Sequence, residues 1–127
     1  MSNPSLIVEG LAHRRGQPEF ELKADFCLAP GERAVLSARS GSGKSTLLRL
    51  LCGFEPLQQG RIRLAGREIT RTEPRLREIG WVSQDPELFS SFSVLENAAF
   101  GLKVRGVSAA ERRKRTLLWV WLSLERN

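Results

Sequence analysis

The residue types most suited to chemistry lie in a glycine- and serine-rich run near position 40. Residues 38–46 read Ala-Arg-Ser-Gly-Ser-Gly-Lys-Ser-Thr, after a short apolar run and before leucines at helical spacing. Glycines let backbone N–H groups approach phosphate oxygens, and a helix N-terminus adds partial positive charge. A strand, such a loop and a helix, in that order, form the context of a triphosphate site. The sequence therefore predicts that residues 38–46 bind a nucleoside triphosphate, with ATP and Mg²⁺ as the expected ligands.

Individual residues of this loop have distinct predicted roles. Lys44 would reach the β- and γ-phosphates as a point charge, Ser45 would offer its hydroxyl to Mg²⁺, and Thr46 would lie near the α-phosphate. Backbone N–H groups would supply the remaining contacts to phosphate oxygens. The predicted nucleotide-binding residues are Ser40, Gly41, Ser42, Gly43, Lys44, Ser45 and Thr46.

One position departs from the strict pattern G-x-x-x-x-G-K-S/T, because Ala38 stands where the first glycine is expected. Alanine costs little there if its φ is negative, whereas a positive φ would strain the loop or weaken binding. The alternative interpretation is a surface turn before an ordinary helix. The preceding strand, the following helix and the unbroken run Gly-Lys-Ser-Thr at 43–46 argue against it.

The elements that must position the loop can be read from the apolar pattern. Residues 20–28 alternate as a half-buried strand would, and residues 33–37 have the mostly apolar character of a buried sheet member. A helix follows the loop, and Gly53 supplies its C-terminal stop. Further strands are expected at residues 6–8, 60–66 (an edge strand) and 79–83, with helical segments at 74–78, 93–100 and from the capping pattern at 108–111 onward.

Length and composition exclude several classes of protein. The 127 residues fit one small domain, and no apolar run approaches the roughly 20 residues of a membrane span. The first residues lack the pattern of a signal peptide, so a cytoplasmic location is expected. Cys27 and Cys52 have no CxxC or histidine partner, and we expect two reduced thiols in the core.

The net charge of +6 and the pI near 10.3 raise the question of a nucleic-acid partner. The arginines are scattered without interleaved aromatics, and the dense run at 112–115 is explained by a solvated helix face. We therefore expect no nucleic-acid partner. A basic nucleic-acid-binding protein stays as an alternative that steep salt dependence would support.

Several motifs together resemble one family, the ATP-binding cassette (ABC) ATPases. Residues 40–48 resemble that family's Walker A loop, and Cys-Gly-Phe at 52–54 with Gln-Gly-Arg-Ile at 59–62 is similar to its helix end and next strand. Ile-Gly-Trp-Val-Ser-Gln-Asp at 79–85 looks like the strand leading to its Q-loop. Val-Leu-Glu-Asn at 94–97 and Phe-Gly-Leu at 100–102 match its V-x-E-N … F-G-L stretch.

This resemblance covers residues 6 to about 115 and implies a fold. The implied class is α/β, a partial P-loop nucleotide-binding core with an N-terminal antiparallel β subdomain. All of residues 1–127 would then form the N-terminal part of an ABC nucleotide-binding domain. Its parts would be strands within 5–37, the Walker A loop at 38–46, the Q-loop at 79–86 and the start of a helical subdomain at 108–127.

The resemblance also assigns roles outside the phosphate loop. Gln84 would touch Mg²⁺ and the attacking water and relay the nucleotide state, although it could be an ordinary loop glutamine. Residues 86–97 would contact a transmembrane permease subunit at the inner face of the membrane, although their apolar side chains could simply pack within the chain. The family's adenine-stacking position falls on Arg15, with His13 or Phe20 as substitutes, or Arg15 could be a solvated surface residue.

The family's signature, its Asp-Glu strand (Walker B) and its switch histidine do not occur in these residues. Asp25 and Asp85 do not close an apolar strand before a glutamate, and His13 precedes the loop. We therefore expect a chain truncated before these regions, one that binds ATP but hydrolyses it slowly. Residues 117–122 are apolar on all faces, which predicts self-association through an exposed helix.

The predicted function is that of the ATPase subunit, or part of one, of an ABC transporter that takes up a solute. Residues 100–106 resemble importers of sugars, polyamines, metal ions or thiamine more than exporters. A small P-loop kinase is a further alternative, and the Q-loop spacing and the E-N … F-G-L stretch argue against it.

Overall fold

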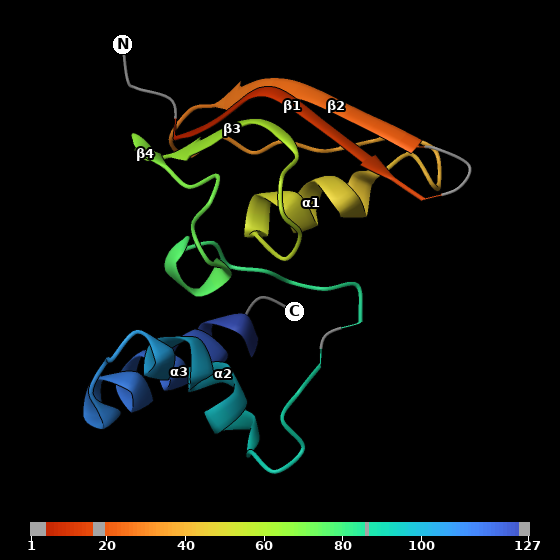
Figure 1. Cartoon of the computed structure of the whole chain (residues 1–127). Helices are drawn as coiled ribbons and strands as arrows, with labels where there is room; N and C mark the ends of the chain where they lie inside the picture. The colour runs from red at the N-terminus through yellow and green to blue at the C-terminus, as the bar shows by residue number, and fades with distance from the viewer. Residues whose placement is uncertain (1–4, 17–19, 86, 125–127) are drawn as a thin grey trace. The chain divides into compact units, whose positions relative to one another are not determined.

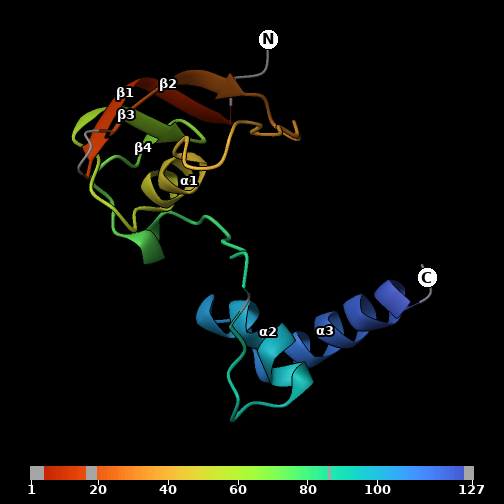
Figure 2. The same cartoon turned by 90° about the vertical axis from the view of Figure 1, so that its right-hand side faces the viewer.

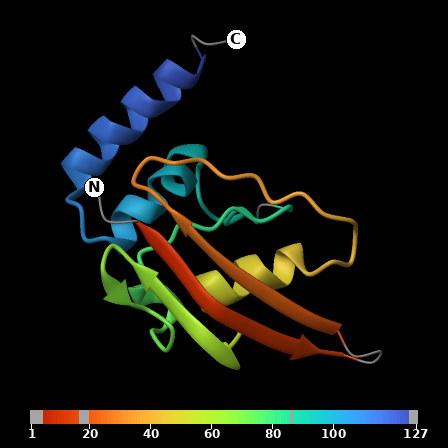
Figure 3. The ribbon, with the colours of Figure 1, turned by 90° about the horizontal axis from the view of Figure 1, so that it is seen from above.

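A computed structural model describes residues 5–16, 20–85 and 87–124 of the chain. These residues form two compact units, residues 1–81 and 82–127, which are described separately. The predicted ranges 5–37, 79–86, 86–97 and 108–127 therefore each include residues that lie outside the described ones. Figures 1, 2 and 3 show the chain from three directions.

The first unit is built on an antiparallel sheet of four strands in the order β2-β1-β3-β4 (Figure 1). The strands are β1 (Leu6–Arg15), β2 (Phe20–Leu28), β3 (Gln59–Leu64) and β4 (Arg67–Glu68). The register of β1 shifts between Val8 and Leu11, where Gly10 adopts a φ of 56° and its N–H donates to Asp25 Oδ1 at 2.8 Å. Such a bulge sharpens the local twist of the sheet.

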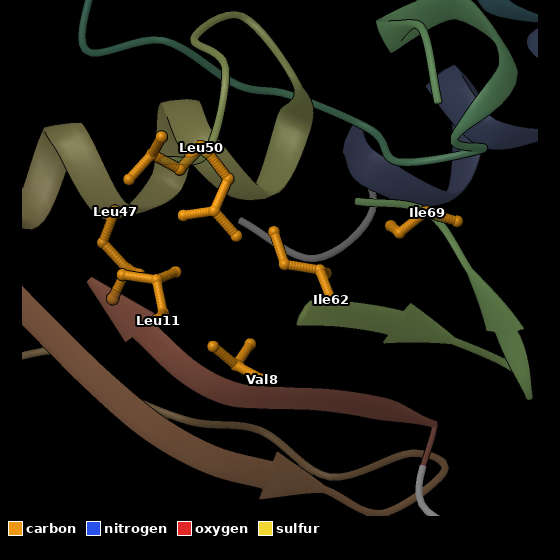
Figure 4. Close-up of a cluster of buried hydrophobic side chains, with 7 residues drawn as sticks. Val8, Leu11, Leu47, Leu50, Ile62 and Ile69 are labelled. Atoms are coloured by element: carbon orange, nitrogen blue, oxygen red, sulfur yellow. The ribbon is translucent and has the colours of Figure 1, made fainter. Parts of the chain in front are cut away.

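Helix α1 (Lys44–Cys52) covers one face of this sheet (Figures 1 and 2). Its buried side chains Leu47 and Leu50 meet Val8, Leu11 and Ile62 from the strands (Figure 4). Leu57 and Ile69 complete the buried cluster. Gly53 ends the helix with a φ of 81°, and its N–H closes onto Leu50 O, so the predicted C-terminal stop is confirmed.

The second unit contains two packed helices, α2 (Val94–Val104) and α3 (Ala109–Leu124). Ser93 caps α2: its Oγ accepts from the N–H of Glu96, whose carboxylate accepts from the N–H of Ser93. Ser108 accepts from the N–H of Glu111 at 3.4 Å, as the capping pattern predicted. Among the described residues, none of the helices is both long and apolar enough to span a membrane.

Two predicted strands do not form. The structure assigns no strand to residues 33–37 or 79–83, and Val35 is 93% exposed, although residues 33–37 had been expected to be buried. A strand is stable only when a neighbouring strand satisfies its backbone groups, and none of the four strands of the first unit pairs with residues 33–37. The apolar pattern alone therefore predicted more strands than the structure contains at these two segments.

Two smaller expectations are also wrong. The alternating strand β3 is not at an edge, because it lies between β1 and β4. Cys27 is exposed while Cys52 is buried, since the odd-numbered positions of β2 face away from the helix-covered side. The segment at 74–78 does begin with the expected single turn, a 3₁₀ helix (η1) over Pro74–Leu76.

The contact between α1 and the sheet yields a prediction about stability. Leu50 is completely buried, so Leu50→Ala should lower the free energy of unfolding of the first unit by about 2–5 kcal/mol through lost burial and a residual cavity. Leu48 lies two positions earlier in the same helix and is 44% exposed, so Leu48→Ala should lower the free energy of unfolding by no more than about 1 kcal/mol. Urea unfolding followed by circular dichroism measures both, and equal losses would contradict the assigned core.

Candidate phosphate-binding site

The loop that leads into α1 takes its shape from two glycines. Gly41 and Gly43 have φ values of 79° and 91°, a region that side chains with a Cβ seldom enter. Between them the N–H of Ser42 donates to Arg39 O at 3.2 Å, which closes a tight turn. The loop residues predicted to bind nucleotide therefore lie together in the first unit, at the turn that leads into α1 and in the first turn of that helix.

The Lys44 side chain folds back over this loop. Its ammonium Nζ donates to Ala38 O at 2.7 Å and to Arg39 O at 2.9 Å. An ammonium group has three donors, so these two bonds leave one for an anion. The same two bonds fix the start of the loop to the start of the helix, which holds the positive charge at the loop.

The N-terminus of α1 is not capped by any side chain. Gly43 occupies the cap position, no side-chain cap bond is made, and no acidic residue lies in the first turn. The Leu47 N–H bonds to Gly43 O, so the N–H groups of Lys44, Ser45 and Thr46 precede the first bond of the helix. Unpaired N–H groups at a helix N-terminus attract an anion.

One further polar atom in the loop is without a partner. Ser42 Oγ is buried and makes no hydrogen bond. Buried polar atoms are nearly always paired in proteins, so an orphan hydroxyl beside unpaired N–H groups suits a ligand rich in hydrogen-bond acceptors. The loop thus fits a phosphate chain by its donors, its charge and its conformation.

Ala38 does not strain the loop. Among the described non-glycine residues, only Ala65 and Glu78 have a positive φ. Alanine at position 38 therefore avoids the left-handed region in which glycine would be needed. The departure from the strict pattern costs no backbone strain, and the carbonyl of Ala38 still accepts from Lys44.

Of the two predicted adenine contacts Phe20 and Arg15, Phe20 lies beside the loop, whereas Arg15 is bonded elsewhere. A Cβ added at Gly43 would overlap the ring of Phe20, so the ring would have to shift, and the φ of 91° independently favours glycine there. Arg15 lies opposite Phe20 in the hairpin register, but its guanidinium donates to Glu55 at 2.9 Å, and Arg49 binds the same carboxylate at 2.7 Å. Arg15 as an adenine contact stays a prediction.

Gln84 belongs to the second unit, where it is exposed at a bend, and its roles at Mg²⁺ and the attacking water stay predictions. In the described part of the chain, no three histidine, cysteine, aspartate or glutamate side chains are grouped to hold a metal ion. A Mg²⁺ ion at Ser45 would take most of its oxygen ligands from phosphates and water, which is the usual arrangement for this ion.

A pocket of about 670 Å³ adjoins the phosphate loop within the first unit. Apolar side chains of β2 and α1, among them Leu22, Phe26 and Leu47, form its walls, and the residues of the unpaired segment 34–36 line it as well. Ser42, Gly43 and Lys44 lie at its border. This pocket was not predicted from the sequence, although the alternation of β2 indicated the apolar face that lines it.

The predicted permease-binding segment forms a distinct aromatic cluster in the second unit. Phe89 lies 4.9 Å from Phe92 and 4.5 Å from Phe100, measured between ring centroids, and Lys103 Nζ lies 5.8 Å above Phe92. Beside the cluster, Leu88 and Val94 are 75% and 82% exposed. Pro86 lies outside the described residues.

Asn97 shapes this segment. Its Oδ1 accepts from the Phe89 N–H at 2.9 Å, and its Nδ2 donates to the carbonyls of Phe89, Phe92 and Ser93 at 3.0–3.2 Å. One amide side chain on α2 thereby holds four backbone groups of the preceding loop. These hydrogen bonds give a local structural reason for asparagine at the last position of the Val-Leu-Glu-Asn motif.

Leu117 and Leu118 are 49% and 56% exposed, while the side chains at 119–122 lie outside those described. Exposed leucines on a helix are compatible with self-association, which stays a prediction.

The sequence profile of a family described as ABC transporter matches residues 22–126. The chain belongs to the ABC transporter family. The predicted resemblance is confirmed, and so is the fold class of an ABC ATPase core with an antiparallel β part.

Three relatives in this family are named as ATP-binding proteins of importers. The chain is 44% identical to the spermidine/putrescine import ATP-binding protein PotA of Frankia alni over 73% of the chain and 20% of that protein. It is 38% identical to the sn-glycerol-3-phosphate import ATP-binding protein UgpC of Burkholderia pseudomallei over 84% of the chain and 30% of that protein. It is also 38% identical to a probable sulfate/thiosulfate import ATP-binding protein CysA of Chlorella vulgaris, over 87% and 47%.

A solved structure shares the fold of this ABC chain. It is a dimeric ATP-binding cassette in a post-hydrolysis state bound to ADP and Pi, 22% identical, with a TM-score of 0.63 over 88% of this chain and 54% of that one. The chain spans about half the length of that structure and from a fifth to about half the length of the three relatives above.

The role of Asn97 can be tested without any partner. Asn97→Ala should speed amide exchange at Phe89 by roughly fivefold, because the acceptor of that N–H, a bond of about 1 kcal/mol, is lost. Hydrogen–deuterium exchange read by NMR measures the rate. Ser90→Ala, at an exposed residue of the same loop, serves as the control. Unchanged protection at Phe89 would contradict the assignment.

Proposed function

We propose that residues 38–46 bind ATP together with Mg²⁺. The observation that carries this proposal is the N-terminus of α1, which has no side-chain cap and begins with Lys44, whose ammonium bonds back to the carbonyls of Ala38 and Arg39. Unpaired N–H groups, a fixed positive charge and the orphan hydroxyl of Ser42 suit a chain of phosphates. The ATP-binding proteins among the relatives support the choice of ATP.

The residues of the site divide the work by chemistry. Lys44 and the N–H groups of Gly41 and of residues 43–46 would bind phosphate oxygens, and the hydroxyl of Ser45 would bind Mg²⁺. The ion would neutralise charge on the phosphates when bound. Gln84 would add a second contact to the ion and orient the attacking water. Arg15 or Phe20 would contact the base.

We also propose a place for the chain within a larger activity. It would act as part of the ATPase subunit of an importer that couples ATP hydrolysis to solute uptake, with residues 86–97 against a transmembrane permease subunit at the cytoplasmic face of the membrane. The import ATP-binding proteins among its relatives support this assignment. The family match disfavours the two alternatives, a small P-loop kinase and a basic nucleic-acid-binding protein.

Replacing the loop lysine tests the site directly. Lys44→Ala should weaken Mg·ATP binding by about 10- to 100-fold, since a charge-assisted hydrogen bond contributes about 1.5–3 kcal/mol. Isothermal titration calorimetry measures the Kd, and Lys114→Ala, an exposed lysine of α3, is the control. Equal affinity in the wild type and Lys44→Ala, with both variants folded by circular dichroism, would reject the site.

The unusual alanine supplies a second test of the same site. Ala38→Gly should leave the Kd for Mg·ATP within about twofold, because the backbone at position 38 needs no positive φ. The same titration measures it. A gain of about tenfold or more in affinity would show instead that alanine does impair the loop.

A further inference from the structure

Arg77 is a buried arginine whose hydrogen bonds all go to backbone carbonyls. Only 3% of the residue is exposed. Its Nη1 donates to Leu50 O at 3.0 Å and to Leu51 O at 2.8 Å, both in the last turn of α1. Its Nη2 donates to Thr70 O at 3.0 Å and its Nε to Thr72 O at 2.8 Å. One side chain thus joins the end of the helix to the segment after β4.

Gly53 and Cys52 lie next to the guanidinium of Arg77. A Cβ at Gly53 would lie 2.5 Å from Arg77 Nε, so the glycine that ends α1 also leaves room for the guanidinium. Burial lowers the pKa of Arg77 from its ordinary value, and burial raises the pKa of the neighbouring Cys52 thiol. A thiol that stays protonated brings no negative charge to Arg77, so the carbonyl dipoles at the helix C-terminus are what favour the cation.

Capping alone does not account for this arrangement. The end of α1 is already closed by the Gly53 N–H on Leu50 O and by the Phe54 N–H on Arg49 O. The additional bonds from Arg77 reach a part of the chain that is more than twenty residues away in sequence. Their distinctive effect is therefore to connect two segments.

A second contact joins the same two segments. The ring of Trp81 packs edge-on against Phe54, with 5.6 Å between centroids and planes at 87°. Phe54 follows Gly53, the residue that ends α1, and Trp81 is four residues beyond Arg77. Residues 77–81 are thus held to the C-terminal end of α1 at both of their ends. Gln84 is three residues further along the chain.

We propose that Arg77 is a positioning residue that couples the phosphate loop to the segment leading to Gln84. Helix α1, about 14 Å long, begins at the loop and ends at Arg77, so a displacement of its N-terminus by bound nucleotide moves residues 77–81 with it. The Trp81–Phe54 contact completes the connection. The inference rests on the proposed nucleotide site, and its prediction is a response of Trp81 to ATP that depends on Arg77.

Tryptophan fluorescence can measure this response in the full chain. Trp119→Phe and Trp121→Phe leave Trp81 as the single tryptophan. In that background, Mg·ATP should change the Trp81 emission, with the same Kd that calorimetry gives. Adding Arg77→Met should reduce the amplitude to less than about a third while the calorimetric Kd changes less than about threefold. Arg75→Met, at an exposed arginine of the same turn that pairs with Glu73, should keep the full amplitude.

A second variant keeps the test decisive if Arg77→Met fails to fold. Phe54→Leu retains apolar packing and Arg77 but removes the ring contact, and it should also reduce the Trp81 amplitude without a comparable loss of affinity. A merely structural role for Arg77 would lower the melting temperature and leave the amplitude of the folded protein unchanged.

The outcomes separate the two proposals. ATP binding without any Trp81 response in the parent, or a full response in both variants, would overturn the coupling and leave the nucleotide site intact. Absence of ATP binding in the parent would overturn the nucleotide site and the coupling with it. A response lost in both variants at preserved affinity would support the coupling.

Discussion

The packing of α1 on the antiparallel sheet is the interaction on which the rest of the first unit depends. Leu50 and Ile62 are completely buried where helix and sheet meet, and Val8 and Leu11 are nearly so. This contact fixes the axis of a nine-residue helix that is too short to be stable by itself. Because the phosphate loop and the Arg77 contacts lie at the two ends of that helix, the same apolar contact orients both.

Local signals allowed much of this arrangement to be predicted, because the residues that cause it are adjacent in sequence. Each of these features is local. The phosphate loop, the glycine that ends α1 and the serine caps of α2 and α3 all form between residues that are at most a few positions apart. The strand β2 was also predictable, since its alternation reports one buried face.

The remaining features depend on partners far away in sequence. The apolar run at 33–37 resembles a buried strand, yet strand formation requires a neighbour that the run itself does not specify. The interior place of β3 follows from its pairing with both β1 and β4, which alternation cannot indicate. Likewise, no sequence pattern around Arg77 indicates that its guanidinium bonds to carbonyls of α1. In the sequence Arg77 cannot be distinguished from the other arginines.

The two ends of α1 differ in a way that has a functional logic. At the C-terminus, Gly53, the Phe54 N–H and Arg77 bond the last carbonyls, so that end gains stability from several groups. At the N-terminus, glycine occupies the cap and forgoes the side-chain hydrogen bond of a serine or aspartate cap, which would add a few tenths of a kcal/mol over glycine. A capping side chain would occupy the same N–H groups that a phosphate needs. The helix is therefore stabilised most at the end where no anion is expected, and its unpaired donors are kept at the end where binding is proposed.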